Sequence, residues 1–272
     1  MMGGVRKLLA AGVLLAGPSA MAAHVLDSSL RLTAEERYDD DFRLNAGGTG
    51  GQFMTKLSPR LGLEVKDERT KAEGFYATDL LVRHGSGNAT LDHRGGVDLG
   101  YALSRRLKVD FTGRLFRVTD PTSLPRDGVA RSLAPTLYGQ ARVSVSERAT
   151  RRLDLRASYA FEGAKEYEVG RMPGFVHTPS VEAWYRSTRR LTLGLEYRYQ
   201  NFLFAGESSH AHGGFAALRY RLTRPTTLTV RGGPVRYTAP DGGAGWLPRY
   251  SVELAREGEL FDVGMIAGHD LV

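Results

Sequence analysis

Residues 190–200 read RLTLGLEYRYQ, and this stretch decides the class of fold. Leu191, Leu193, Leu195, Tyr197 and Tyr199 fall on one side of an extended chain, because successive side chains of a β-strand point to opposite faces. The threonine, glycine, glutamate, arginine and glutamine between them fall on the other side. The stretch therefore predicts a β-strand with one apolar face and one face that contacts water.

The same alternation returns along most of the chain and predicts thirteen strands. Turns rich in Arg, Ser and Thr or in Gly, Pro and Asp bound these segments, and no linker or low-complexity segment divides them into two domains. The predicted strands are residues 28–38, 52–66, 73–84, 92–103, 106–118, 133–145, 150–162, 174–187, 190–202, 212–223, 226–237, 246–256 and 260–270.

This pattern is typical of an all-β fold, namely an antiparallel up-and-down transmembrane β-barrel of about 12–14 strands. A soluble sandwich of two sheets also alternates. However, the chain has isoleucine only at position 266, and its charged residues recur far into the strands, which disfavours a sandwich. An arginine at the lipid midplane costs ~2–4 kcal/mol, so charges in period-two register are expected to face water or each other.

The odd strand number is at variance with a simple closed barrel, because bacterial outer-membrane barrels have an even number of strands. Either the count is wrong by one, or this chain contains part of a larger, incomplete barrel. Residues 268–272, GHDLV, also lack the terminal aromatic residue that barrel-assembly machinery commonly recognises.

Residues 1–22 are expected to form a secretory signal peptide, with residues 23–272 as the outer-membrane barrel domain. Arg6 and Lys7 precede an apolar run that is too short to cross a bilayer as a helix, and small residues follow it. The net charge of +7 includes these two residues, which leaves +5 for the mature chain. Its basic residues are spread along the strands, so we expect no nucleic-acid partner. The chain has no cysteine and hence no disulfide.

Two kinds of connection alternate along the chain. Short turns at residues 103–107, 149–153, 187–191 and 222–226 share a Ser/Thr-Arg-Arg/Pro core. Longer segments rich in Gly, Pro, Asp and His are expected at residues 119–132, 162–174, 205–213 and 238–247. Short turns on the periplasmic side and long loops outside are the rule for such barrels.

The alternation assigns each strand residue to lipid or to the lumen. The expected lipid-facing residues are Leu107, Val109, Phe111, Leu115, Leu153, Leu155, Tyr159, Phe161, Leu228, Val230, Tyr250, Val252 and Leu254. The expected lumen-lining residues are Lys108, Asp110, Arg114, Arg142, Asp154, Arg156, Glu196, Arg198, Arg219, Arg221, Arg231 and Glu253. These charges either orient passing solutes or pair across neighbouring strands and stiffen the wall.

The sequence predicts no catalytic, cofactor-binding or metal-binding residue, and hence no enzyme. The His210-Ala211-His212 pair is the only clustered histidine pair, and without a visible third ligand a surface loop explains it as well as a metal site. The acidic run at residues 39–41 lacks the glycine and bidentate glutamate of a calcium loop.

Several stretches together resemble porin-like bacterial outer-membrane β-barrel proteins. They are Leu30-Arg31-Leu32, the Arg-Tyr-Asp-Asp-Asp run at residues 37–41, the LSPRLGL run at residues 57–63 and the repeated Leu-Ser-Arg-Arg-Leu-type turns. Some members of that broad group accompany exopolysaccharide synthesis and export. The resemblance implies a channel or export role, and no substrate or catalytic residue is carried over from it.

The sequence thus favours an outer-membrane channel that passes or exports polar or anionic solutes, polysaccharide among them, through a lumen lined by arginines and acids. One alternative is a structural or adhesive barrel with a plugged lumen and partner-binding external loops, and a weaker one is an outer-membrane lipid-modifying enzyme. The expected partners are outer-membrane lipid and the barrel-assembly machinery, with a periplasmic export partner as an open alternative.

Overall fold

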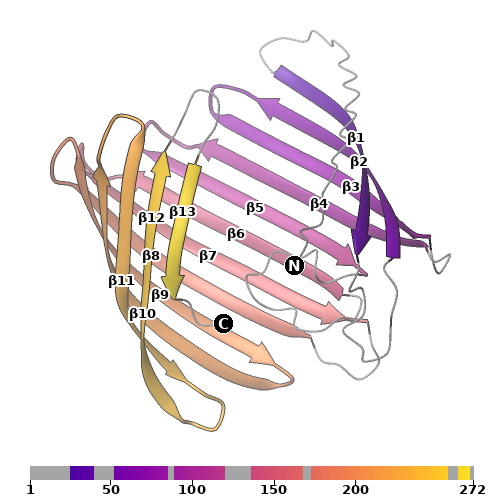
Figure 1. The fold of residues 1–272 in the computed structure, drawn as a ribbon. Coiled ribbons are helices and arrows are strands. Elements are labelled where there is room, and N and C mark those ends of the chain that lie inside the picture. The colour runs from indigo at the N-terminus through magenta and orange to yellow at the C-terminus, as the bar shows by residue number, and fades with distance from the viewer. Residues whose placement is uncertain are drawn as a thin grey trace.

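The computed structural model describes residues 25–39, 52–84, 89–119, 136–167, 173–256 and 263–269. These residues form thirteen β-strands in one sheet (Figure 1). The strands are β1 (Val25–Asp39), β2 (Gln52–Lys66), β3 (Thr70–Arg83), β4 (Ala89–Ala102), β5 (Leu107–Val118), β6 (Thr136–Arg148), β7 (Leu153–Glu166), β8 (Gly174–Arg186), β9 (Leu191–Phe204), β10 (Glu207–Arg221), β11 (Thr226–Thr238), β12 (Ala244–Arg256) and β13 (Val263–His269).

Every strand pairs antiparallel with its neighbours in sequence, so the order across the sheet is β1 to β13 without a crossover. This arrangement confirms the predicted all-β, up-and-down fold. Within the described ranges, no helix is long and apolar enough to span a membrane.

The sheet is strongly curved but not closed. Figure 1 shows the strands following one another round the curve, from β1–β3 on one side to β12 and β13 on the other. Among the described residues, no pairing joins β13 to β1. The fold is therefore a barrel-like open sheet with two edge strands.

Burial identifies the concave face of the curved sheet. Ala77, Tyr138, Ala160 and Phe215 are buried, and the strand registers place them on the same face as the charged residues. The leucines and tyrosines of the opposite face are widely exposed, with Leu195 at 68%. Side chains converge on the inside of a curve and shield one another there, so the charged face is the concave one.

Small apolar clusters occupy the concave face toward the end opposite the short turns. Val118, Tyr138 and Ala164 form one cluster, with Phe116 packed against it. A second consists of Ala211, Phe215 and Val235, with Phe202 packed against it. Toward this end, the concave face therefore carries apolar side chains as well as polar ones.

The four predicted short turns are confirmed as tight connections at one end of the sheet. The hydroxyl of Thr188 accepts hydrogen bonds from the backbone N–H groups of Arg190 at 3.2 Å and Leu191 at 3.0 Å. Ser104 and Thr150 make the same pair of bonds in their own turns. A side-chain oxygen that satisfies two turn N–H groups explains why Ser or Thr precedes the paired arginines.

The predicted loop at residues 205–213 is wrong. β9 ends at Phe204 and β10 begins at Glu207, so His210 and His212 lie within a strand. Ala205 and Gly206 alone form the turn, with φ of 52° and 85°. Positive φ at both central residues is the geometry of a type I′ hairpin, whose twist matches that of the flanking strands. The Ser- and Gly-rich sequence suggested a longer loop than the backbone forms.

Other predicted connections also shift. β7 continues to Glu166 and β12 begins at Ala244, so the second and fourth long segments are shorter than predicted. The first three residues of the strand predicted at 133–145 lie outside the described residues. The predicted signal peptide at residues 1–22 and most of the predicted loop at residues 119–132 lie outside the described residues.

Replacing Ala205 with asparagine is expected to stabilise the β9–β10 hairpin. An alanine in the left-handed region costs ~1–2 kcal/mol, and asparagine tolerates that region better. We expect Ala205→Asn to raise the free energy of unfolding by about 0.5–1 kcal/mol, measured by urea titration in lipid vesicles. Ala205→Val serves as the opposite control and should lower it. Equal stability of all three proteins would contradict the type I′ assignment.

Candidate functional site: the charged concave face

The strand registers place all twelve expected lumen-lining residues on the concave face. For example, Arg156 lies opposite Glu182, Glu182 opposite Glu196, and Glu196 opposite Phe215, which links β7 to β10 on one face. The expected lipid-facing residues share the convex face, as Val230 opposite Val252 illustrates. The residues placed on the concave face are Lys108, Asp110, Arg114, Arg142, Asp154, Arg156, Glu196, Arg198, Arg219, Arg221, Arg231 and Glu253.

Glu196 on β9 anchors one ionic cluster. Its carboxylate accepts a hydrogen bond from Nε of Arg198 at 3.1 Å and pairs with Nη2 of Arg231 at 2.6 Å. The Glu196 side chain is only 9% exposed, so this charge depends on both partners. The guanidinium groups of both arginines also lie over the ring of Phe215, at 5.8 and 4.4 Å. The cluster therefore ties β9, β10 and β11 together.

Several other expected residues pair locally. Lys108 and Asp110 form an ion pair at 2.5 Å on β5, and Arg114 pairs with Asp98 on β4 at 2.5 Å. Asp154 lies 3.6 Å from Arg148. These pairs support the alternative in which the charges stiffen the wall.

Sequence reasoning missed a second ionic cluster centred on Asp79 of β3. Asp79 is 6% exposed, and its carboxylate accepts hydrogen bonds from Ser58 at 2.6 Å and Arg94 at 2.7 Å. Lys56 lies 3.4 Å away and adds a further positive charge. The participants come from three different strands. The alternation of each strand shows only that these side chains share a face. Their contacts depend on how β2, β3 and β4 are aligned with one another, which the sequence does not give.

Glycines make room for large aromatic rings on the same face. Phe75 lies opposite Gly96 and Trp184 opposite Gly194. A Cβ at Gly96 would lie 2.5 Å from the ring of Phe75, and one at Gly194 would lie 2.7 Å from that of Trp184. Each ring covers the bare backbone of the glycine, as in aromatic rescue.

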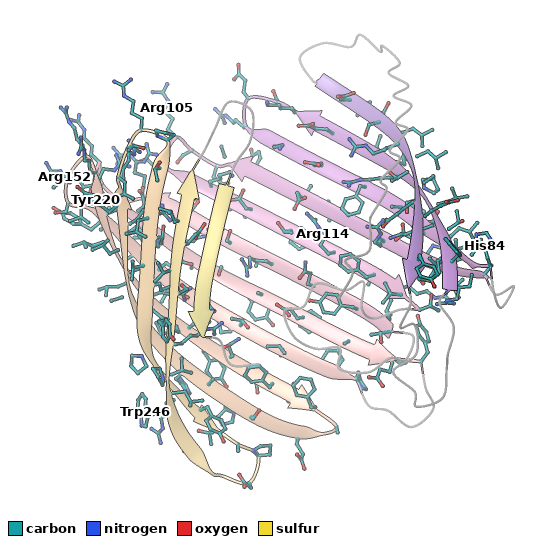
Figure 2. All side chains as sticks on the ribbon, viewed as in Figure 1. His84, Arg105, Arg114, Arg152, Tyr220 and Trp246 are labelled. Carbon is teal, nitrogen blue, oxygen red and sulfur yellow. The ribbon has the colours of Figure 1, made fainter. Side chains whose placement is uncertain are left out.

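A cavity of about 470 Å³ opens at the short-turn end of β8 to β11. Its lining consists only of arginines and threonines: Arg186, Arg189, Arg190, Thr192, Arg219, Arg221 and Thr227. Figure 2 shows Arg105, Arg152 and Tyr220 at this end of the sheet, with His84 and Trp246 far from it. Of the arginines in this lining, the sequence predicted only Arg219 and Arg221 as lumen-lining, because the other arginines lie in or beside predicted short turns, to which no face was assigned.

Four histidines of the described strands, His93, His177, His210 and His212, lie on the face opposite the charged one. Tyr197 and His212 are hydrogen bonded through the phenol oxygen and Nδ1 at 2.8 Å, and the registers place both on the convex face together with His210. Equivalent bonds join Tyr76 to His93 at 2.7 Å and Tyr159 to His177 at 2.6 Å. In the described part of the chain, no group of three or more His, Asp or Glu side chains is placed to hold a metal ion.

Comparison with known proteins gives no relative from which a function could be carried over. The sequence matches no protein-family model, and no curated protein is significantly similar to it. The functional conclusion therefore rests on the geometry of the two faces.

Removal of the Glu196 carboxylate should destabilise the sheet. Glu196→Leu would leave Arg198 and Arg231 without their shared counter-charge, and breaking a buried ion pair costs ~3–5 kcal/mol. Because these arginines keep some contact with water, we expect a loss of about 2–3 kcal/mol in the free energy of unfolding.

The matched control is Glu253→Leu, which removes an exposed carboxylate from the same face and should change stability by less than ~0.5 kcal/mol. Urea titration of the two variants in identical vesicles makes the comparison. Equal losses would show that the Glu196 cluster does not hold the strands together.

Proposed function

We propose that this chain forms the wall of a water-filled channel in the outer membrane of a Gram-negative bacterium. The channel passes or exports polar or anionic solutes, with polysaccharide as one class of cargo. One observation carries the proposal: the sheet keeps its exposed apolar side chains on the convex face and most of its charges on the concave face, and the charged residues on the convex face, such as Arg117, Glu147 and Arg236, lie near strand ends.

The convex face supports contact with lipid. Leu195 is 68% exposed, and leucines, valines and tyrosines of the neighbouring strands surround it on that face. A contiguous apolar surface of this extent is unfavourable in water, whereas the hydrocarbon core of a membrane covers it without cost.

The connections support an orientation in that membrane. Short turns on the periplasmic side are the rule for such barrels, so the short turns between β4 and β5, β6 and β7, β8 and β9, and β10 and β11 would lie on that side. Three Tyr–His pairs join β3 to β4, β7 to β8 and β9 to β10 on the convex face, with each tyrosine near the middle of its strand and each histidine nearer the end away from the short turns.

The concave face supports a preference for anions. Its twelve expected lining residues comprise eight basic and four acidic side chains. Arg142 and Arg156 in the middle of the sheet are exposed, and Arg156 donates a hydrogen bond to Ser144 at 3.1 Å. Basic groups that project into a wet lumen attract anions and exclude cations.

A channel also requires a closed wall. Unpaired backbone groups at a sheet edge in lipid cost several kcal/mol each, so the outer edges of β1 and β13 must pair with each other or with further strands. More than about eight strands leave room for water inside a barrel. The thirteen strands of this chain exceed that number.

A structural or adhesive barrel is the second candidate function. The Asp79 and Glu196 clusters favour it, because buried ionic clusters that link several strands stiffen a wall whether or not solutes pass. Neither candidate function gives the chain a catalytic role or a cofactor.

The proposed partners of the channel are membrane lipid, the assembly machinery and, on the basic turns, a periplasmic export partner.

Ion conductance tests the channel. Residues 23–272, refolded into a planar bilayer at neutral pH, should give steady single-channel steps, and a salt gradient should give a reversal potential of the sign for anion selectivity. Reversal of two charges in the double variant Arg142→Glu/Arg156→Glu should shift that potential toward cation selectivity.

The matched control keeps both charges in the double variant Arg142→Lys/Arg156→Lys, which should retain anion selectivity. Well-inserted protein without conductance would reject the channel in favour of the plugged structural barrel. Conductance with unchanged selectivity in the charge-reversed variant would mean that the concave face does not line the path.

A further inference from the structure

We propose that the arginine-lined cavity at the short-turn end of β8 to β11 is a binding site for a linear polyanion that carries carboxylate or phosphate groups. This inference rests on the proposed function, since it assigns the site where anionic cargo would enter the channel. The argument concerns five side chains: Arg186, Arg189, Arg190, Arg219 and Arg221.

The strand registers bring these residues together on the concave face. Arg186 of β8 lies opposite Thr192 of β9, and Thr192 lies opposite Arg219 of β10. One step nearer the turns, Arg221 lies opposite Thr227 of β11. Arg189 and Arg190 complete the lining from the turn between β8 and β9. The site is thus built by four consecutive strands and does not depend on one flexible loop.

The cavity has no acidic side chain in its lining. Among the described residues, none of the five guanidinium groups forms an ion pair. Like charges gathered without counter-charge repel one another, and a bound anion removes that repulsion. An arginine fork also matches carboxylate and phosphate oxygens through two parallel hydrogen bonds.

The β6–β7 hairpin shows where a neutralising carboxylate can stand beside such a turn. Directly after its paired arginines, the β6–β7 turn continues Leu153-Asp154, and Asp154 pairs with Arg148 across the hairpin at 3.6 Å. In the β8–β9 turn the corresponding residue is Thr192, opposite Arg186. The β8–β9 hairpin therefore lacks the carboxylate that pairs with Arg148 in the β6–β7 hairpin. This leaves Arg186 available to a ligand.

Arg219 is held in place for binding. Its guanidinium carbon lies 4.8 Å from the centre of the Trp184 ring, and that ring is itself packed over Gly194. Stacking uses the flat face of the guanidinium and leaves its N–H edge free to donate. A side chain fixed before binding loses less conformational entropy when the ligand arrives.

A second cavity of about 340 Å³ shares Arg186, Thr192 and Arg219 and continues along the concave face to Arg156. The lining of this second cavity also contains Asp154 and Glu182. The unbalanced positive charge is therefore concentrated in the first cavity, at the short-turn end. An extended ligand fits two adjoining cavities better than a single small ion. The concave position also favours a soluble polymer over membrane headgroups, which would contact the convex side.

Binding is tested on the full mature chain in nanodiscs of zwitterionic phosphatidylcholine by isothermal titration calorimetry. The probes are a galacturonic acid oligomer, a short polyphosphate and a neutral glucose oligomer of matched length. We expect at least one polyanion to bind, with affinity that falls steeply with salt, and the neutral oligomer to bind far more weakly. Preference for galacturonate or for polyphosphate then identifies the charged group as carboxylate or phosphate.

Two variants test the site itself. Arg219→Gln/Arg221→Gln should weaken polyanion binding about tenfold or more, since charged hydrogen bonds are lost. Thr192→Asp/Thr227→Asp keeps all five arginines but supplies the counter-charges of the neighbouring hairpin, and should weaken binding similarly. The control Arg105→Gln/Arg106→Gln removes two arginines from a different turn and should leave affinity within about twofold, and near-UV circular dichroism checks folding of every variant.

Equal binding of the neutral oligomer, or unchanged affinity in both site variants, would overturn the proposal. The proposal would also be overturned if none of the soluble polyanions bound and the arginines instead bound the headgroups of vesicles that contain anionic phosphatidylglycerol. Binding does not require conductance, so the two proposals can fail separately. Polyanion binding without conductance would remove the channel and keep the site, whereas conductance without binding would do the reverse.

Discussion

The continuous ladder of backbone hydrogen bonds across thirteen antiparallel strands is the constraint on which the rest of the structure depends. Antiparallel pairing places directly opposed residues on the same face, so each register carries the apolar and charged positions of one strand onto the next. A slip of one residue would exchange the two faces of a strand and move most of its leucines to the concave face and most of its arginines to the convex face. The two faces remain distinct because all twelve registers agree.

Charge changes along the concave face in a way that follows from this ladder. Residues near the short turns are rich in arginine, and the apolar clusters around Tyr138 and Phe215 lie toward the other end. At the level of these clusters, Asp79 and Glu196 neutralise nearby basic groups, and Glu196 lies directly opposite Phe215. An anion approaching from the turns would meet unpaired positive charge first and paired charge later. This order is consistent with capture at an entrance followed by weaker contact inside.

Much of this organisation was predictable from the sequence, because alternation is a local property of each strand. It gave the number of strands, the short turns and the face of every expected lining residue. It failed at Ala205-Gly206, because these two residues form a type I′ turn without the Asn or Asp that usually precedes the glycine of such a turn. The Asp79 cluster and the arginine cavity were also missed, because their members lie on different strands and meet only through the registers.

The central claim, that one face contacts lipid and the other water, is tested most directly by a nitroxide scan of residues 191–200. The chain has no cysteine, so each single-cysteine variant carries one label. In lipid vesicles, labels at odd positions should be accessible to oxygen dissolved in the bilayer. Labels at even positions should be accessible to a water-soluble nickel chelate. Uniform accessibility to the chelate along the stretch would contradict the account, because the leucine face would then contact water.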